Sequence, residues 1–303
     1  MSTNEPYSTP AAVEAAIKTA ANYAFVVDPT LTVQERIRLA HFDRFLSRVF
    51  SEGDDSDWML KGGTAMLARV PSTRATTDVD LFLRNHTLDA ALEDLRRLAS
   101  KDLEDFFRFT VTAYSPLAEG NQQADAEGYR VTFETYVGVK SKGGFHVDLV
   151  VNVVTTDAVE VARPANALNL PKLAQHAYRL YPTVDQIADK VCATFALYRG
   201  RPSTREKDLV DLVVLAATQD VSARKLSRAL EAEARTRSLV LPPTFAAPTA
   251  WGRVYASEAT SIPACADFRT IEEALALMHR FLDPVLAEEV IDSTWSHTAL
   301  AWL

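Results

Sequence analysis

The sequence predicts an α+β fold, with a lobe built on a mixed β-sheet over residues 1–165 and a mainly helical lobe over residues 166–303. Segments with the two-residue alternation of strands lie before residue 152, and segments with the three- and four-residue periodicity of helices dominate after residue 184. Strands followed by helices are typical of an α+β lobe joined to a helical bundle. With 303 residues, 48% hydrophobic and 24% charged, the chain is long enough for two packed lobes.

The first elements are expected to be helical. The polar start Met1–Pro10 is interpreted as a frayed tail, followed by helices over 11–22 and 33–50, the second with apolar residues at three- and four-residue steps. After a turn over 51–57, a short strand is expected at 58–61. Gly62-Gly63 ends this strand, and a helix from Thr64 ends before Pro71, because the residue before proline disfavours the helical region.

Four further strands and one helix complete the expected sheet lobe. We expect a strand at 79–83, a helix at 88–99, and strands at 106–114, 129–140 and 145–151. The middle strand of the last three alternates well, with Val131 and Phe133 against Thr132 and Glu134, as a half-buried antiparallel strand should. The segment 140–144 (KSKGG) is expected to be the hairpin connection to the last strand.

The remainder of the chain is predicted to be helical. Helices are expected at 184–198, 205–218, 221–237, 268–281 and 285–291. The stretch 239–266 is rich in proline and alanine and is predicted to be irregular, although Phe245 and Trp251 should pack it against the core.

Composition excludes several classes of protein. No window approaches the roughly 18 apolar residues of a membrane span, and the N-terminus lacks the pattern of a signal peptide. Cys192 and Cys265 are too few for a metal site and are expected to be buried free thiols, so we predict a cytoplasmic protein. With a net charge of -8, the chain would contact nucleic acid only through a local basic patch.

Two short motifs carry the chemistry. A Gly62-Gly63-Thr64 turn at a helix start offers backbone N–H groups and a hydroxyl to a phosphate chain, and glycine permits close approach of the backbone. Asp78 and Asp80 follow on a strand, where residues two apart project from the same face and can converge on one cation. Hard oxygen ligands next to a polyphosphate predict Mg²⁺ with an NTP.

Three more residues extend this predicted site. Asp148 lies in the middle of an apolar strand, and it is the candidate for the further carboxylate that two-metal chemistry requires. Lys61 flanks the glycine turn and is expected at the phosphates. Arg74 could also reach phosphate, although it could equally be a solvated loop residue.

The order of these motifs resembles the nucleotidyltransferase superfamily of the DNA polymerase β type. More narrowly, it resembles the AbiEii toxins of type IV toxin–antitoxin systems, the MenT-like proteins among them. The residues that carry the resemblance are Leu60–Ala65, Ser72–Asp80, Asp185–Lys190 and Lys207–Leu212. It extends from about residue 35 to 220, and the last 80 residues match only as a helical tail.

The resemblance implies a nucleotidyltransferase-type sheet lobe and a catalytic set in which Asp80 is the principal metal ligand. Residues matching Lys190 and Asp211 belong to that set, and Asp208 could orient a neighbouring cation. Physical alternatives stay open: Lys190 could be a surface lysine, and Lys207 could form an i, i+4 salt bridge with Asp211.

The resemblance also implies partners. The acceptor would be the 3′ end of a tRNA, the inhibitor would be a separately encoded antitoxin, and neither a membrane nor DNA is expected. The segment Arg199–Lys207 and the helix with Arg224, Lys225, Arg228, Arg235 and Arg237 are the basic concentrations that could contact RNA. As a hypothesis, phosphorylation of Thr76 or Thr77 would silence the neighbouring acids.

Other activities are compatible with the same residues. The acceptor could be a small molecule or a protein hydroxyl, or the fold could be a catalytically silent module that binds RNA or a partner. A silent module would be expected to have lost an acid of the pair, and both Asp78 and Asp80 are present. A kinase would transfer the γ-phosphate, but the sequence has no Gly-x-x-x-x-Gly-Lys loop to support it.

Overall fold

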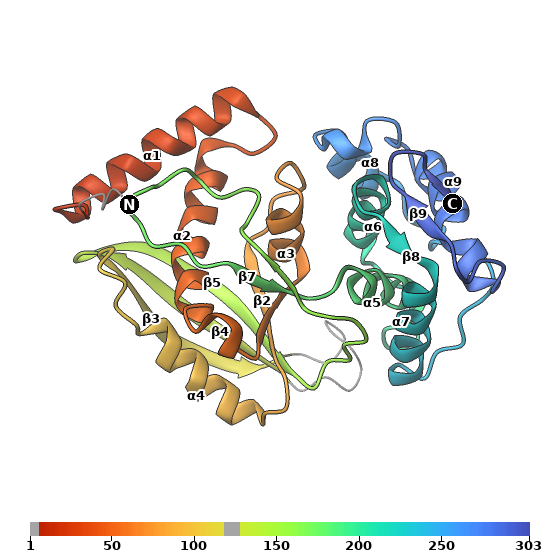
Figure 1. The fold of residues 1–303 in the computed structure, drawn as a ribbon, viewed down its shortest axis with the longest axis horizontal. Helices are drawn as coiled ribbons and strands as arrows, with labels where there is room; N and C mark the ends of the chain where they lie inside the picture. The colour runs from red at the N-terminus through yellow and green to blue at the C-terminus, as the bar shows by residue number, and fades with distance from the viewer. Residues whose placement is uncertain (1–5, 118–127) are drawn as a thin grey trace. The chain divides into compact units, whose positions relative to one another are not determined.

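The computed structural model describes residues 6–117 and 128–303. These residues form two compact units (Figure 1). Unit 1 contains residues 6–117, 128–153 and 160–180, and unit 2 contains residues 154–159 and 181–303. The lobe boundary expected near residue 165 therefore falls inside a segment of unit 1.

Unit 1 is built on a seven-stranded sheet with the strand order β3-β4-β5-β2-β1-β7-β6. β2 pairs in parallel with β5 and β1 pairs in parallel with β7, whereas the other neighbours are antiparallel. The sheet is mixed, as predicted from the sequence. Its strands are β1 (Trp58–Lys61), β2 (Asp78–Leu83), β3 (Phe107–Pro116), β4 (Gly128–Val137), β5 (Lys140–Val151), β6 (Glu160–Ala162) and β7 (Tyr178–Leu180).

The helices of this unit are α1 (Pro10–Val27), α2 (Val33–Val49), α3 (Gly62–Arg69) and α4 (Leu88–Ala99), with a short 3-10 turn at Gly53–Asp55. Thr9 caps α1, and Pro10 occupies its first turn, so the helix begins inside the segment expected to be a frayed tail. The first five residues of that expected tail lie outside the described residues. Thr32 and Glu35 form a capping box that starts α2 at the predicted position.

The core of unit 1 lies on one face of the sheet. Every second strand residue faces it, including Leu60, Leu81 and Leu149, which are fully buried. Residues of α2 and α4 belong to the same cluster and cover this face (Figure 1). Because side chains alternate along a strand, the intervening polar residues project from the opposite face.

Helix α2 also buries charge. Arg44 and Arg48 lie between apolar residues in the sequence, yet both side chains are fully buried. Arg48 donates two hydrogen bonds to the Asp105 carboxylate at 2.6 and 3.0 Å, and Arg44 donates to Asp43 at 2.9 Å. A charged residue between the apolar positions of a helix is therefore not always exposed to solvent, because an oppositely charged residue far along the chain can pair with it.

The hairpin between β4 and β5 differs from the prediction. Val137 pairs with Lys140, so the turn is Gly138-Val139 and the segment 140–144 is the start of β5. Gly138 has φ +58° at the first central position, which is the glycine position of a tight two-residue turn. The Gly pair at 143–144 instead lies beside a β-bulge, where Gly143 adopts φ +92°.

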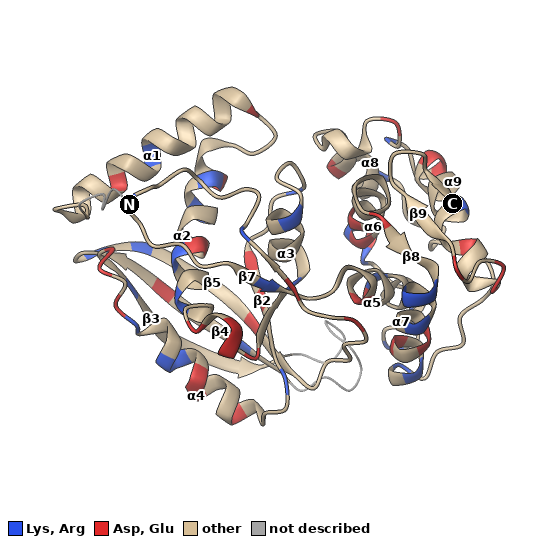
Figure 2. Cartoon of the chain, viewed as in Figure 1, with Lys and Arg blue, Asp and Glu red and all other residues tan. Residues whose placement is uncertain are grey.

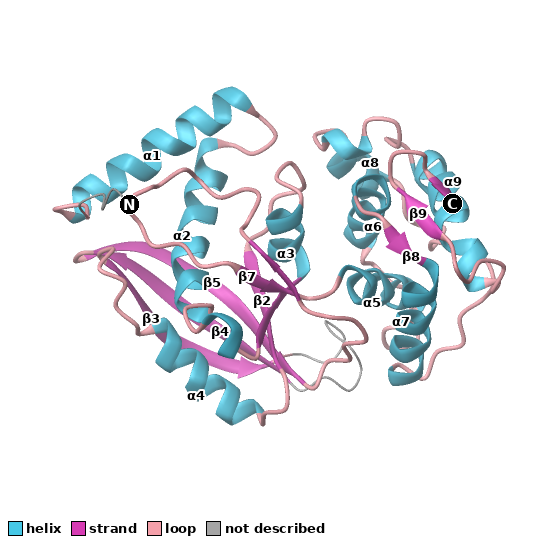
Figure 3. Cartoon of the chain, in the orientation of Figure 1, coloured by secondary structure: helices cyan, strands magenta, loops and turns pink. Residues whose placement is uncertain are grey.

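Unit 2 is predominantly helical (Figure 3), as predicted. The expected irregular stretch 239–266 contains a helix and a 3-10 turn, and one helix replaces the two expected over 268–291. That helix contains Pro284 two residues before its end. A three-stranded sheet, built around the buried Trp295, was not predicted. The elements are α5 (Thr183–Phe195), α6 (Glu206–Thr218), β8 (Val221–Ser222), α7 (Ala223–Thr236), α8 (Arg253–Ala259), η2 (Pro263–Cys265), α9 (Ile271–Leu286), β9 (Thr294–Ser296) and β10 (Ala301–Trp302).

No helix within residues 6–117 and 128–303 has the length and apolar character needed to cross a membrane. The two cysteines are free and buried, as expected, and burial raises the pKa of the Cys265 thiol to about 12.

Candidate active site

A row of charged residues crosses four strands of the unit 1 sheet. Lys61 on β1 pairs with Asp80 on β2, Asp80 pairs with Asp148 on β5, and Asp148 pairs with Arg130 on β4. Residues directly opposite each other on paired strands project from the same face. The row is therefore a strip of charged residues in the order cation–acid–acid–cation, on the face of the sheet opposite the core.

Asp78 stands two residues before Asp80 on the same strand. Both side chains are half-buried, whereas Val79 and Leu81 between and beyond them are fully buried in the core. The strand alternation expected from the sequence therefore places the two acids on one face. Two carboxylates converge there, and the described residues contain no group of three or more His, Cys, Asp or Glu suited to hold a metal ion.

Asp78 and Asp80 fit one particular mode of Mg²⁺ binding. Mg²⁺ usually takes one or two carboxylates from the protein and completes its octahedron with water and substrate phosphates. Asp78 and Asp80 suit that arrangement with an NTP. Without a nucleotide, most of the octahedron of such a cation would be left to water.

Asp148 has a partner that the sequence analysis did not name. Arg130 donates from Nε to Oδ1 at 2.8 Å and from Nη2 to Oδ2 at 2.7 Å, so both oxygens of the carboxylate are engaged. These hydrogen bonds raise the pKa of Arg130, and the carboxylates of Asp148, Asp78 and Asp80 raise it further. The alternation of β4 already placed Arg130 on the polar face with Thr132. The register that sets it opposite Asp148 could not be read from the sequence.

The glycine turn lies against Asp80. Gly62 adopts φ +63°, and a Cβ added to it would lie 1.9 Å from Asp80 Oδ2. A side chain at Gly63 would meet Thr76 at 3.0 Å and Arg74 Nη1 at 3.7 Å. The turn therefore needs glycine because a carboxylate and a threonine occupy the space of the missing side chains, and Arg74 reaches the start of α3.

Thr64 has a structural contact at this turn. Its side chain is buried, and its hydroxyl donates to the Asp78 carbonyl at 2.9 Å, which ties α3 to β2. Lys61 occupies the N-cap position of α3 and makes no side-chain capping hydrogen bond. The start of α3 thus presents backbone N–H groups without a side-chain cap from the preceding residue.

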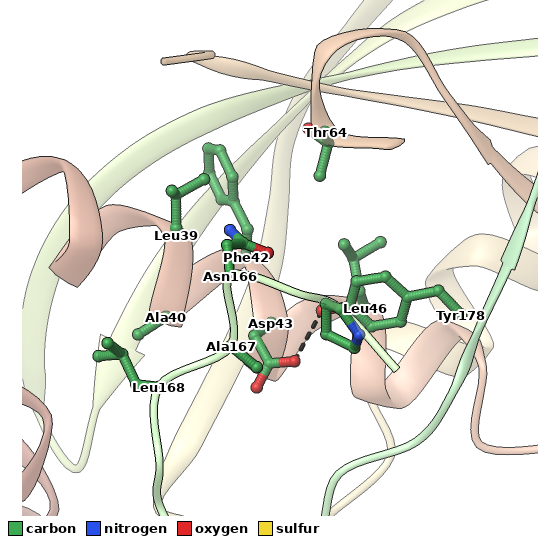
Figure 4. Close-up of a pocket in the computed structure, with 11 residues that line it drawn as sticks. Leu39, Ala40, Phe42, Asp43, Leu46, Thr64, Asn166, Ala167, Leu168 and Tyr178 are labelled. Carbon is green, nitrogen blue, oxygen red and sulfur yellow. Dashed lines mark hydrogen bonds between the residues drawn. The ribbon is translucent and has the colours of Figure 1, made fainter. Parts of the chain in front are cut away.

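A small cavity lies on the core side of Thr64. It is lined by residues of α2 and of the segment 164–168, and Tyr178 donates a hydrogen bond to Asp43 at 2.7 Å beside it (Figure 4). Its volume of about 20 Å³ is the space of about one water molecule. This cavity is too small for a nucleotide.

A larger pocket, about 390 Å³, opens at the beginning of β2. Thr77 and Asp78 line it together with Arg38, Lys142 and two histidines, His41 and His146. The Nε of Arg38 is buried without a hydrogen-bond partner among the described residues. Lys142 forms an ion pair with Glu14 at 2.8 Å, and burial lowers the pKa of His41 to about 4. The sequence analysis missed this pocket, because α2 and β5 are far apart along the chain.

Unit 2 contains a second cluster of charge around Lys190. Its ammonium donates to Asp208 at 2.8 Å and to Asp211 at 2.6 Å, and all three side chains are buried. Burial alone would raise the pKa of the Asp208 carboxyl. Lys190 and Arg205, whose Nε is 2.6 Å away, outweigh burial and hold that pKa well below its usual range.

Both open alternatives for this cluster are wrong. Lys190 is not a surface lysine, since only 4% of it is exposed. Lys207 does not pair with Asp211; its ammonium contacts Glu258 at 2.8 Å, whereas Asp211 binds Lys190. Lys207 points away from Asp211 because the i, i+4 position on α6 is buried and already compensated from α5.

Other residues of the two unit 2 motifs have structural partners. Asp185 accepts hydrogen bonds from the backbone and hydroxyl of Thr156 at 2.6 to 3.0 Å, which holds the segment after β5. Burial raises the pKa of the Asp185 carboxyl. Asp189 is paired with Arg237. Within the motif Asp185–Lys190, Asp185 and Asp189 therefore have structural partners outside α6, and Lys190 is the residue that contacts carboxylates on α6.

The basic helix is largely compensated inside unit 2. Lysine and arginine recur along α7 (Figure 2), but Arg224 pairs with Asp292, Lys225 pairs with Asp157 at 2.9 Å, and Arg228 donates to the Thr156 carbonyl. Cations that already have partners attract a polyanion less strongly than a charge count suggests.

Comparison with known proteins identifies a family. A family model described as the nucleotidyl transferase AbiEii toxin of the type IV toxin–antitoxin system matches residues 44–295. The match extends beyond residue 220, where the sequence resemblance was expected to end, and includes α8 and α9. No curated protein matches the chain.

The chain is also similar to solved structures. JHP933 from Helicobacter pylori matches with a TM-score of 0.45 and 16% identity, over 86% of this chain and 96% of that one. An antigenic nucleotidyltransferase-like protein from Paracoccidioides brasiliensis matches with a TM-score of 0.35 and 15% identity, over 66% of this chain and 89% of that one.

Proposed function

The chain belongs to the AbiEii family of nucleotidyltransferase toxins of type IV toxin–antitoxin systems, and on that basis we propose a specific reaction. In it, the protein transfers a nucleoside monophosphate from an NTP to the 3′ end of a tRNA and releases pyrophosphate. The family implies an NTP as co-substrate and an antitoxin as partner. The tRNA acceptor, Mg²⁺ and the roles of individual residues belong to the proposal.

One observation supports the chemistry above all. Asp78 and Asp80 project from one face of β2, and the Asp80 carboxylate packs against the glycine turn that starts α3. Carboxylates for a cation and backbone N–H groups for phosphate thus lie within one strand–turn–helix–strand unit, β1–α3–β2. Mg²⁺ bound there would stabilise negative charge on the α-phosphate and the attacking hydroxyl.

The chain's own residues divide the remaining work. Asp78 and Asp80 hold the cation and orient the α-phosphate, with Asp148 as the candidate third carboxylate. The N–H groups of Gly62, Gly63 and Thr64, together with Lys61 and Arg74, bind the β- and γ-phosphates, so the charge of the leaving pyrophosphate is already offset. A bond forms from the acceptor oxygen to the α-phosphorus as the bond to the β-phosphate oxygen breaks.

For Lys190 and Asp211 the proposal rests on the family motifs. Lys190 offsets triphosphate charge, and Asp211 orients the acceptor or acts as a base. Their hydrogen bond makes them one unit, since removal of either charge leaves the other buried with less compensation. A substitution at one position is therefore a test of both.

The acceptor is proposed to be a polyanion because of the pocket at Thr77–Asp78. Arg38 and Lys142 in its lining, and in particular the Arg38 Nε that has no hydrogen-bond partner among the described residues, favour phosphate over a cationic small molecule. The compensated charges on α7 make that helix a weaker candidate for RNA contact.

The experiment is a labelling panel. Each of the four NTPs, labelled at the α-phosphate, is incubated with the protein and total tRNA, a protein mixture or an aminoglycoside. We expect label on tRNA alone and no transfer from γ-labelled NTP. Label on protein or on the drug would mean that the acceptor is not tRNA. Transfer of the γ-label would indicate a kinase, and no transfer to any acceptor would favour a silent binding module.

The matched variants are Asp80→Asn and Asp54→Asn. Asp80→Asn keeps the shape of the side chain and removes the charge, so labelling should fall at least about 100-fold. Asp54 has a fully exposed side chain, so its amide should leave labelling unchanged. Equal labelling by Asp80→Asn and wild type would refute the assignment of the active site.

A further inference from the structure

Arg130 on β4 lies opposite Asp148 on β5, and its contact with Asp148 is of a specific kind. Both guanidinium nitrogens that face Asp148 donate to it, one to each oxygen, at 2.8 and 2.7 Å. A bidentate pair of this type fixes the carboxylate in position and orientation. The pair occupies one lone pair of each Asp148 oxygen and directs the carboxylate towards Arg130, so a cation that takes both oxygens must displace the guanidinium.

The two partners differ in exposure. The Arg130 side chain is 38% exposed, whereas that of Asp148 is 9% exposed. Arg130 can withdraw into water at low cost, because partly exposed ion pairs contribute little. Asp148 cannot, since a buried carboxylate without a partner is strongly unfavourable. Asp148 consequently requires some cation, but this cation need not be Arg130.

The neighbouring strand supplies the reason for an exchange. Asp80 is the direct cross-strand partner of Asp148 on the same face, and Asp78 is the next residue along that face. A cation bound by these two acids would lie beside Asp148 and compete with the guanidinium for its oxygens. A divalent ion carries twice the charge of Arg130 and prefers carboxylate oxygen.

We propose that Arg130 and a divalent cation compete for the Asp148 carboxylate, so that Asp148 joins Asp78 and Asp80 as a ligand when Arg130 withdraws. Arg130 is then a positioning residue that keeps Asp148 compensated and oriented before the cation arrives. This inference rests on the proposed function, which assigns Asp78 and Asp80 as metal ligands. The released guanidinium stays on the same face of the sheet, where a phosphate oxygen is the ligand that its planar fork matches best.

Binding of Mn²⁺ to the nucleotide-free full chain, measured by electron paramagnetic resonance or calorimetry, tests the competition without any activity assay. Arg130→Gln should bind Mn²⁺ about five- to tenfold more tightly than wild type, since the competing pair is gone. Arg130→Lys should bind with intermediate affinity, because lysine can form one of the two contacts. Wild-type or weaker affinity in Arg130→Gln would overturn the inference.

A double-mutant cycle separates competition from a general effect of charge. In the Asp148→Asn background, Arg130→Gln should no longer change the Mn²⁺ affinity; a gain of the same size there would also overturn the inference. Arg108→Gln is the matched control, since Arg108 pairs with Tyr136 on the same face of the sheet but has no contact with Asp148 among the described residues. It should bind Mn²⁺ as wild type does.

The same titration distinguishes the two levels of the proposal. Asp80→Asn should lose Mn²⁺ binding if Asp78 and Asp80 form the metal site. If it binds as wild type does, the metal assignment in the proposed function fails. If Asp80→Asn loses binding and Arg130→Gln is unchanged, only the competition fails. Thermal unfolding of each variant confirms that the compared proteins are folded.

Discussion

Replacement of Gly62 by alanine tests the close contact between the glycine turn and Asp80. The added Cβ would lie 1.9 Å from Asp80 Oδ2, and ordinary contact begins near 3.4 Å, so the carboxylate must retreat by about 1.5 Å. A displacement of about 1 Å at a catalytic group can cost about 100-fold in rate. The backbone adds its own cost, because alanine at φ +63° is less stable than glycine by about 1 to 2 kcal/mol.

The assay is transfer from α-labelled NTP to total tRNA, with urea unfolding measured on the same samples. Gly62→Ala should reduce kcat/KM at least about 100-fold and the unfolding free energy by about 1 to 2 kcal/mol. Gly53→Ala is the control: Gly53 has φ +58°, and nothing lies within 4 Å of its added Cβ. It should lose similar stability and no activity. If Gly62→Ala behaves like Gly53→Ala in both measurements, the contact with Asp80 does not matter for the reaction.

Three further predictions concern the other charged groups. In urea unfolding, Lys190→Met should reduce the unfolding free energy by about 3 to 5 kcal/mol, because it leaves buried carboxylates without their cation. Lys207→Met, the control at an exposed ion pair, should reduce it by less than about 1 kcal/mol. Equal losses in the two variants would contradict the buried cluster. In initial-rate measurements, Arg38→Gln should raise KM for tRNA severalfold and leave KM for NTP unchanged. The reverse pattern would indicate that this pocket binds the NTP and not the acceptor. The pKa of His41 falls from 6.5 to about 4 on folding, so the unfolded state takes up a proton at a higher pH than the folded state does. The unfolding free energy should therefore decrease as the pH is lowered from about 6.5 towards 4. His41→Gln should flatten this pH dependence, and an unchanged dependence would mean that other groups cause it.

The sequence was sufficient to predict the acid pair, and the reason is local. Asp78 and Asp80 lie two residues apart on a short apolar strand, and strand alternation alone sets them on one face. The same reasoning yielded α2 and α4, because each has a strong period and a threonine cap at its start. The mixed sheet was expected from the family resemblance. Family motifs added Lys190 and Asp211, which no periodicity would have joined.

Contacts between distant segments could not be predicted in this way. Arg130 meets Asp148 only because β4 and β5 pair in one register, and a bulge between Thr135 and Tyr136 shifts that register within the hairpin. The two-residue turn at Gly138 was overlooked because the Gly-Gly pair that follows has the stronger composition of a turn. A register that depends on a bulge is set by packing on both faces of the sheet.

The two charged clusters differ in whether a further cation is electrostatically favoured. Around Lys190, two cations (Lys190 and Arg205) meet two carboxylates (Asp208 and Asp211), and the side chain of Lys190 is only 5% exposed. A balanced and buried set of this kind has no electrostatic demand for a further ion.

On the sheet face of unit 1, three carboxylates (Asp78, Asp80 and Asp148) lie in register with two cations (Lys61 and Arg130), and the acid pair on β2 is half-exposed. A half-exposed pair of acids on one face of a strand is a place where a divalent cation is electrostatically favoured. Metal binding should consequently be lost with Asp80 and kept with Asp208. Lys190 can offset triphosphate charge only if it gives up part of its contact with Asp208 or Asp211, so its role in the reaction is tied to how firmly those two carboxylates hold it.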